Sequence, residues 1–134
     1  MKSPVSLLYE SDLKIFQEAQ ALAKAGLSET TGVALRGAAS KVLQVQTDLA
    51  NLKGMILYSL AFSKTSLHKE WQSIVDAHFG ENLSFHKIES YANSDPKYSA
   101  ILEEISGLEA LLSIIEDNLW ALRSIIKFYS SSTN

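Results

Sequence analysis

The sequence of 134 residues contains no cysteine. Disulfide scaffolds, zinc sites with thiolate ligands and enzymes with a cysteine nucleophile are therefore excluded, and the chain suits a reducing compartment. Long hydrophobic runs are also missing, because none approaches the ~18 residues that a membrane-spanning helix needs. The first residues, "MKSPVSLLYESD", lack the apolar region of a secretory signal. We therefore expect a cytoplasmic protein.

Proline is scarce, with two in the chain, and no stretch alternates apolar and polar residues as a half-buried strand would. The sequence instead predicts an all-α fold with one domain that covers the whole chain. Ser11 and Gly26 are typical of the two ends of a first helix. A helical connector is expected at 65–93, with a short helix around Trp71 and another capped by Ser84. The helices are expected at about 11–25, 33–64, 84–92 and 96–129.

The last predicted helix has a clear start signal. Ser94 or Asp95 can accept hydrogen bonds from the first free N–H groups, and Pro96 suits the first helical position because it has no N–H to satisfy. Apolar residues then recur in alternating steps of three and four at Tyr98, Ile101, Ile105, Leu108, Leu112, Ile115, Leu119, Leu122, Ile126 and Tyr129. The second helix has the same spacing at Ala38, Val42, Val45, Leu49, Leu52, Ile56 and Ser59. We expect the two to pack as an extended antiparallel coiled-coil hairpin, joined by the connector and accompanied by the short first helix.

The last helix carries a second apolar stripe, displaced by two residues from the first. A single partner helix can bury only one of the two, and an exposed stripe of Leu, Ile and Phe would be a liability. Either the first helix or another copy of the chain can cover it. We predict a homo-oligomer joined through this stripe, with the polar Asn118 setting the register. The interface residues are Leu111, Ile114, Asn118, Ile125 and Phe128.

Side chains with the spacing needed for catalysis are absent from the sequence. His68, His78 and His86 are ten and eight residues apart, which does not place two imidazoles on one helical face for a metal. The carboxylates include no Glu-x-x-His pair, and no nucleophile elbow or phosphate-binding loop occurs. We expect a protein without enzymatic activity, metal or cofactor.

Charge is distributed unevenly, although the net charge is −3. Residues 1–70 hold eight Lys/Arg and six Asp/Glu, whereas residues 71–134 hold four and nine. No acid occurs between Leu49 and Lys69, where Lys53 and Lys64 also lie. Two interpretations stay open, an anion-binding surface and a solvated helix face.

One family resemblance begins at Ser94-Asp95 and becomes strongest in "LLSIIEDNLWALRS". Together with the upstream segment "LKGMILYS", this region resembles the UvsY-like family of bacteriophage recombination mediators. The chain has Met55 where the family has a basic residue two positions after the lysine that corresponds to Lys53. The positions that match the family pattern in the last helix are Leu111, Leu112, Ile114, Leu119, Ala121, Leu122, Arg123 and Ser124.

The resemblance implies a non-enzymatic, ring-like homo-oligomer that binds single-stranded DNA and helps to load a RecA-type recombinase. Its setting would be the cytoplasm of the host cell. Arg36, Lys41, Lys53 and Lys64 would contact phosphates, and Tyr58 would stack on a base. The alternative is a helical interaction or adaptor protein that binds no nucleic acid, such as a phage structural protein or an inhibitor of a host system. The acidic second half of the chain favours this alternative.

Overall fold

The computed structural model describes the backbone of residues 8–25 and 32–132, and the side chains of residues 8–24 and 40–127. The expected side-chain roles of Arg36 and Phe128 lie outside the described residues, as do Gly26 and the turn that follows it. Within the described part the protein is all-α, as predicted, with four helices and no strand. The helices are α1 (Glu10–Ala25), α2 (Gly32–Ala77), α3 (Phe85–Ser94) and α4 (Pro96–Ser132).

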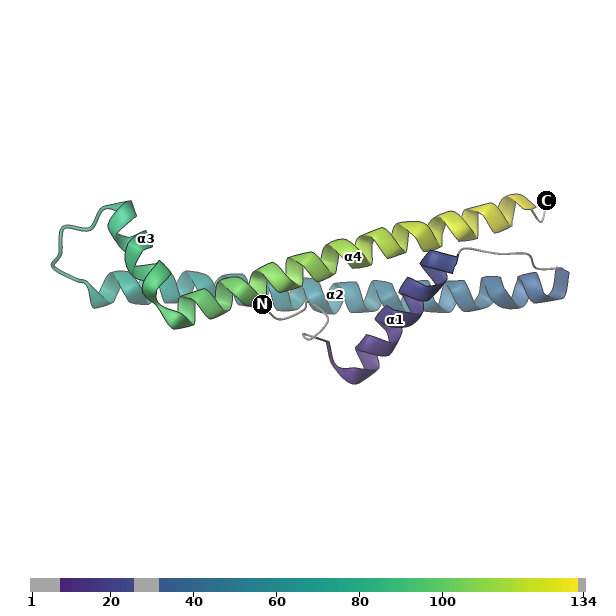
Figure 1. Cartoon of the computed structure of the whole chain (residues 1–134), viewed down its shortest axis with the longest axis horizontal. Helices are drawn as coiled ribbons and strands as arrows, with labels where there is room; N and C mark the ends of the chain where they lie inside the picture. Colours follow the sequence, from purple (N-terminus) through teal and green to yellow (C-terminus); the bar gives the residue numbers. More distant parts are fainter. Residues whose placement is uncertain (1–7, 26–31, 133–134) are drawn as a thin grey trace.

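The two long helices, α2 and α4, run antiparallel along most of the molecule (Figure 1). The short helix α1 crosses this pair obliquely near the middle, and α3 lies at the far end, where the chain turns back from α2 into α4. The bundle is therefore elongated, with three helices around its middle.

Helix α2 is longer than expected, because it continues without a break from Gly32 to Ala77. The prediction that regular helix ends near residue 64 is wrong. Thr65, which looked like the start of the connector, donates its hydroxyl to the Ala61 carbonyl at 3.0 Å, so its polar group is satisfied inside the helix. The apolar side also continues through Leu60 and Ile74, both buried, whereas the predicted seam residue Ser59 is exposed.

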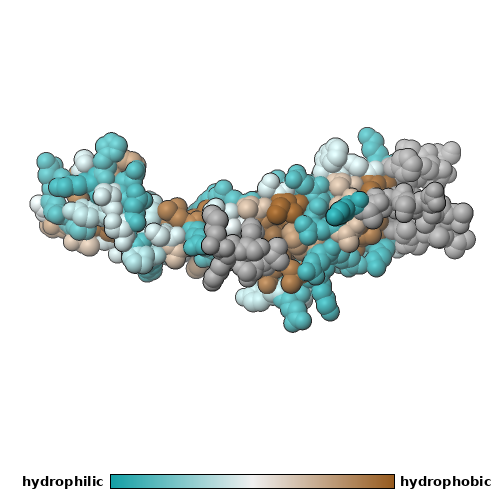
Figure 2. Space-filling view, in the orientation of Figure 1, coloured by the Kyte–Doolittle hydropathy of each residue, from teal (hydrophilic) through white to brown (hydrophobic). Residues whose placement is uncertain are grey.

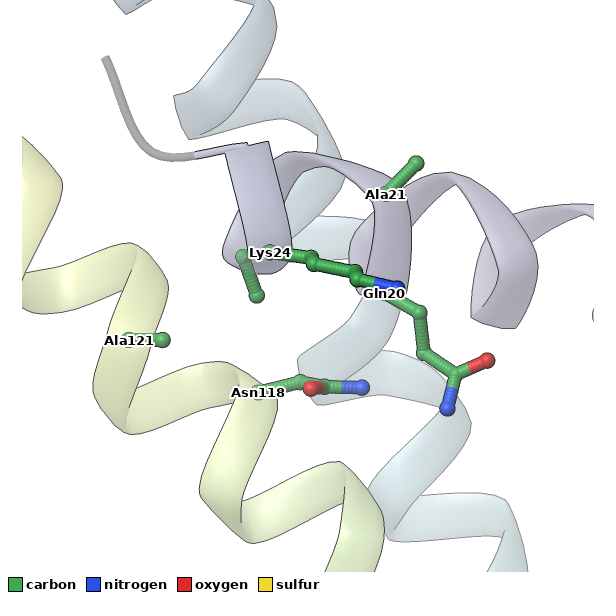
Figure 3. A pocket seen from close by; sticks show the side chains of 6 residues that line it. Gln20, Ala21, Lys24, Asn118 and Ala121 are labelled. Carbon is green, nitrogen blue, oxygen red and sulfur yellow. The ribbon is translucent and has the colours of Figure 1, made fainter.

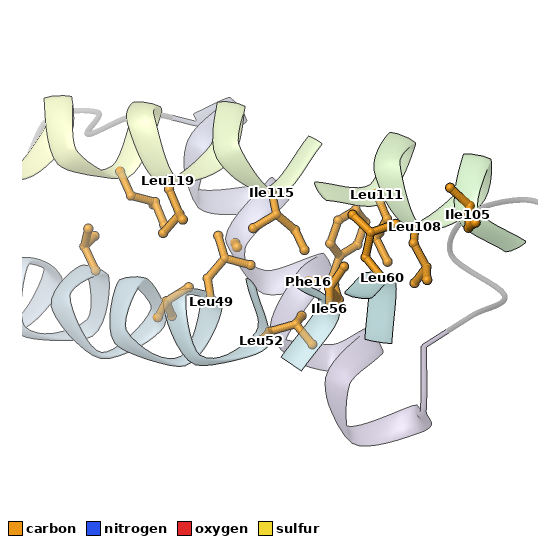
Figure 4. Packing of buried hydrophobic residues seen from close by; sticks show 14 residues of the cluster. Phe16, Leu49, Leu52, Ile56, Leu60, Ile105, Leu108, Leu111, Ile115 and Leu119 are labelled. Atoms are coloured by element: carbon orange, nitrogen blue, oxygen red, sulfur yellow. The ribbon is translucent and has the colours of Figure 1, made fainter. Parts of the chain in front are cut away.

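The core is a single row of side chains between α2 and α4, joined from the side by α1 (Figure 4). Phe16 of α1 reaches into this row and is only 1% exposed, and Ala19 one turn later is fully buried. The three-four spacing of the predicted seams accounts for most of the buried residues. The buried members are Phe16, Ala19, Val42, Val45, Leu49, Leu52, Ile56, Leu60, Ile105, Leu108, Leu111, Ile115, Leu119 and Leu122.

The helix starts at the α3 end follow the predicted caps. The Ser84 hydroxyl accepts a hydrogen bond from the Lys87 N–H at 3.3 Å, and α3 begins at the next residue. Asp95 Oδ1 accepts from the Lys97 N–H at 3.3 Å, and α4 begins at Pro96. These two starts are confirmed.

The start of α1 differs from the prediction by a short distance. Ser11 is not the cap but lies inside the first turn, because the helix already begins at Glu10. The Leu13 N–H donates to the Tyr9 carbonyl at 2.8 Å, which closes the first turn one step earlier in the chain.

Hydrophobic residues show on the surface mainly around the middle of the molecule, in patches separated by polar side chains (Figure 2). The α3 end is largely hydrophilic in the same view. Within the described residues, no helix combines the length and the apolar character needed to cross a membrane.

Candidate nucleic-acid interface

The lysines expected to contact phosphates lie on different sides of α2, and two of them face carboxylates. Lys53 Nζ lies 3.5 Å from Glu116 Oε1 on α4, and Lys41 Nζ lies 3.0 Å from Glu18 Oε1 on α1. The 12 positions between the two lysines turn them about 120° apart around the helix. Lys41 and Lys53 therefore do not form a shared basic surface.

Lys64 lies in a different setting, beside a cluster of aromatic rings. It lines an open pocket of about 420 Å³ together with Leu67, His68, Trp71, Phe85 and Tyr98. The ring centroid of Trp71 is 5.7 Å from that of Phe85 and 6.0 Å from that of Tyr98. These three rings come from α2, α3 and α4, so the pocket exists only when α3 folds back onto the long helices. Phe85 lines the pocket and is 64% exposed, so its ring is accessible to solvent.

The aromatic pocket continues a line of side chains along α2. Lys64 and Trp71 follow Lys53 by 11 and 18 residues, and both spacings return to nearly the same side of an α-helix. We name the line of Lys53, Leu57, Lys64 and Trp71 the lysine flank. It extends over about 27 Å at 1.5 Å per residue. Lys53 lies at the N-terminal end of the lysine flank. Lys64 lies toward the C-terminal end, beside the aromatic rings of the pocket.

Tyr58, expected to stack on a base beside the lysines, points elsewhere. It is 77% exposed. Its position five residues after Lys53 and six before Lys64 turns it by about 120–140° from both. It shares the outer side of α2 with Met55 and Phe62, three residues before and four residues after it. The structure thus separates Tyr58 from the basic residues that the sequence grouped with it.

The apolar stripe predicted to join subunits is covered within the chain. Leu111 is fully buried, and Ile114 and Ile125 are half-buried against the same core cluster. Helix α1 lies over this side of α4 and contributes Phe16 and Ala19 to that cluster. Within one chain the first helix, one of the two alternatives in the sequence, therefore covers this stripe, and a homo-oligomer joined through it stays a prediction.

Asn118 lies in the same stripe, at the wall of a groove between α1 and α4 (Figure 3). Gln20 and Lys24 of α1 line this groove, whose volume is about 500 Å³. The Asn118 Nδ2 is buried and has no hydrogen-bond partner among the described residues. The amide therefore faces α1 of its own chain.

A polar cluster holds the turn between α2 and α3. His78 Nδ1 lies 2.6 Å from Glu81 Oε2, and the Tyr91 ring stacks on the His78 ring with centroids 3.7 Å apart. The Tyr91 hydroxyl donates to Glu81 Oε1 at 3.3 Å. Removal of the phenol from water and the negative charge of Glu81 raise the pKa of Tyr91 above its usual value. This cluster lies beside the turn at Gly80, whose positive φ of 94° suits glycine.

The sequence did not identify the aromatic pocket as a site. In the sequence Trp71 indicates only a short connector helix, and Tyr98 is only one position in the apolar pattern of the last helix. The available signal was the spacing of Lys64, Leu67 and Trp71, which places all three toward one side of a helix that continues past residue 64. Compared with protein-family models, with curated proteins and with solved structures, the chain gives no match.

Proposed function

We propose that this protein binds single-stranded DNA along the lysine flank and acts, without catalysing a reaction, as a recombination mediator. One observation carries the DNA-binding part: Lys64 lies in an open pocket beside the rings of Trp71, Phe85 and Tyr98. Proteins that hold single strands combine cations for the phosphates with aromatic faces on which bases stack. Stacking is worth ~1–3 kcal/mol per base and tolerates any sequence.

The ion pair at the other end of the lysine flank is compatible with this role. The Lys53 side chain is 32% exposed and that of Glu116 is 53% exposed, so the pair is in contact with water. Surface pairs of this kind contribute ~0–1 kcal/mol. A phosphate can therefore replace Glu116 as the partner of Lys53 at little cost.

The mediator part of the proposal rests on the resemblance in α4 and in the segment around Lys53. It implies that the protein brings a RecA-type recombinase onto strands that a single-strand-binding protein covers. The relevant assay follows the displacement of a labelled single-strand-binding protein by a RecA-type recombinase, with and without this protein. Faster displacement supports the mediator role, and an unchanged rate opposes it whatever the DNA affinity.

DNA binding is tested by fluorescence anisotropy of a labelled oligonucleotide over a range of salt concentrations. Two phosphate contacts on a single strand predict a slope of log K against log salt of about −1.4. Lys64→Glu should weaken binding and reduce the slope, whereas Lys14→Glu, on an exposed position of α1, should do neither. Phe85→Ala should weaken binding without changing the slope, and the exposed Phe79 provides the matched control as Phe79→Ala. No binding at ~50 mM salt, where phosphate contacts are strong, would refute the proposal.

A second candidate function is that of a helical interaction protein that binds no nucleic acid. The observation that favours it is the exposed apolar group on the outer side of α2, formed by Met55, Tyr58 and Phe62. Exposed patches of this kind mark contact sites for other proteins. This candidate would be favoured if the wild-type protein binds no DNA and if Tyr58→Glu abolishes its function.

A further inference from the structure

The side of α2 that faces away from α4 is apolar at its centre. Met55, Tyr58 and Phe62 are 54%, 77% and 67% exposed, and their spacing of three and four residues aligns them on one face. We call this side the outer face. At ~150–250 Å² for a fully covered aromatic side chain, the three expose roughly 350 Å² of mainly apolar surface. That is the scale at which a surface patch on a single chain is often functional.

Charged residues begin only where this apolar centre ends. From Leu49 to Ser63 the single charged residue is Lys53, which lies on the lysine flank instead. Continued in steps of three and four, the outer face reaches Asn51 and Asp48 toward the N-terminus, and Ser66 and Lys69 toward the C-terminus. One end of the face is therefore acidic and the other end is basic.

This order of charges is complementary to itself when one copy is reversed. If two outer faces meet antiparallel about a point between Tyr58 and Ser59, Met55 lies opposite Phe62 of the other copy. Asp48 then lies opposite Lys69, and the two-fold axis repeats this contact at both ends. In a parallel arrangement the same Asp48 would face its own counterpart, and like charges would meet.

We infer that the outer face of α2 binds a second copy of this chain, with the two α2 helices antiparallel and the two-fold axis between Tyr58 and Ser59. The contact can extend from Lys41 to Asp76, about 52 Å of helix at 1.5 Å per residue. The apolar centres of two copies supply roughly 700 Å², and the polar ends must supply the rest of the ~1,200–2,000 Å² of a stable interface. The dimer is consequently reversible and depends on concentration. The inference is independent of DNA binding, because Lys53, Lys64 and Trp71 lie on another side of the helix.

A charge exchange tests both the partner and the orientation. Asp48→Lys and Lys69→Asp should each raise the dimer dissociation constant about tenfold, since the two-fold axis places each like-charge contact in the dimer twice. The double variant Asp48→Lys/Lys69→Asp should return it to the wild-type value. Asp117→Lys, at an exposed site on α4, is the matched control and should change nothing. Sedimentation equilibrium measures the constant, and circular dichroism checks that each variant stays helical.

The absence of cysteine allows a second test with no background. Met55→Cys mixed with Phe62→Cys should form a disulfide-linked pair under mild oxidation, whereas neither variant alone should link efficiently. Three results would overturn the inference: a wild-type chain that stays monomeric at all concentrations, a double charge variant that does not recover, or Met55→Cys that links to itself as fast as the mixture does. The affinity of the Asp48→Lys variant for single-stranded DNA, measured by fluorescence anisotropy, tests the proposed function separately from dimerisation.

Discussion

Replacement of Phe16 by alanine tests whether α1 is the element that covers the second stripe of α4. The ring is 1% exposed and lies in the core row between α2 and α4. Burial of ~200 Å² at ~25 cal/mol per Å² corresponds to about 5 kcal/mol, and measured Phe→Ala substitutions in cores cost ~3–5 kcal/mol. Apart from this ring, Ala19 is the only α1 side chain among the described residues that is fully buried, while Ile15 and Leu22 pack on the core half-buried, so Phe16 is the largest single anchor of the helix.

Phe16→Ala should therefore release α1 while α2 and α4 stay folded, as a local opening that costs less than global unfolding. Hydrogen exchange should show α1 amides losing protection while the amides of α2 around Leu52 keep theirs. Light scattering should show a larger species, because Leu111 and Ile114 would then face water and associate. Tyr9→Ala, at an exposed position just before the helix, is the control. An unchanged exchange pattern in α1, or a loss of protection throughout the bundle, would contradict this reasoning.

Three further predictions concern single positions. Gly54→Ala should raise the free energy of unfolding by about 0.5–1 kcal/mol, because an added Cβ meets no described atom within 4 Å and alanine favours the helix. Thermal denaturation measures this effect, and a lower melting temperature would contradict it. Asn118→Leu should stabilise the chain by ~1 kcal/mol in the same assay, because it removes a buried N–H without a partner among the described residues. A loss of stability would show that the amide makes a hydrogen bond in solution. The Tyr91 phenol should ionise above the ordinary tyrosine pKa of 10.0, measured as the difference between the ultraviolet titrations of the wild-type chain and of Tyr91→Phe. Because its folded pKa is raised, the contribution of Tyr91 to stability is complete below its unfolded pKa near 10.0 and decreases as the pH rises through the folded value. A difference titration with its midpoint at or below 10.0 would refute this.

The helix starts at Ser84 and Asp95 could be predicted because a cap is a local interaction. A side-chain oxygen satisfies an N–H two or three residues later, so the signal lies within one turn of the sequence. The continuation of α2 past Thr65 could not be predicted in this way. Just before Thr65 the packed side of the helix passes through Ser63, which is buried, and a polar residue at such a position interrupts the apolar pattern in the sequence.

The candidate site was harder to predict than the fold, because its contacts join distant parts of the chain. The pair Lys53–Glu116 links α2 to α4, and nothing near either residue indicates the other. The aromatic pocket needs Trp71 and Phe85 on two helices that meet only after the turn at Gly80. Sequence spacing shows which side of a helix a residue occupies, but the partner of that side is determined by tertiary packing.

The length of α2 has a consequence for how the molecule moves in solution. Its 46 residues span about 69 Å, and a rod of that length has a radius of gyration near 20 Å. A compact domain of the same chain length would have about 14 Å. A single copy must therefore tumble slowly and elute from a gel-filtration column ahead of a globular standard of equal mass. Small-angle scattering should give a pair-distance distribution with a long tail even for the monomer.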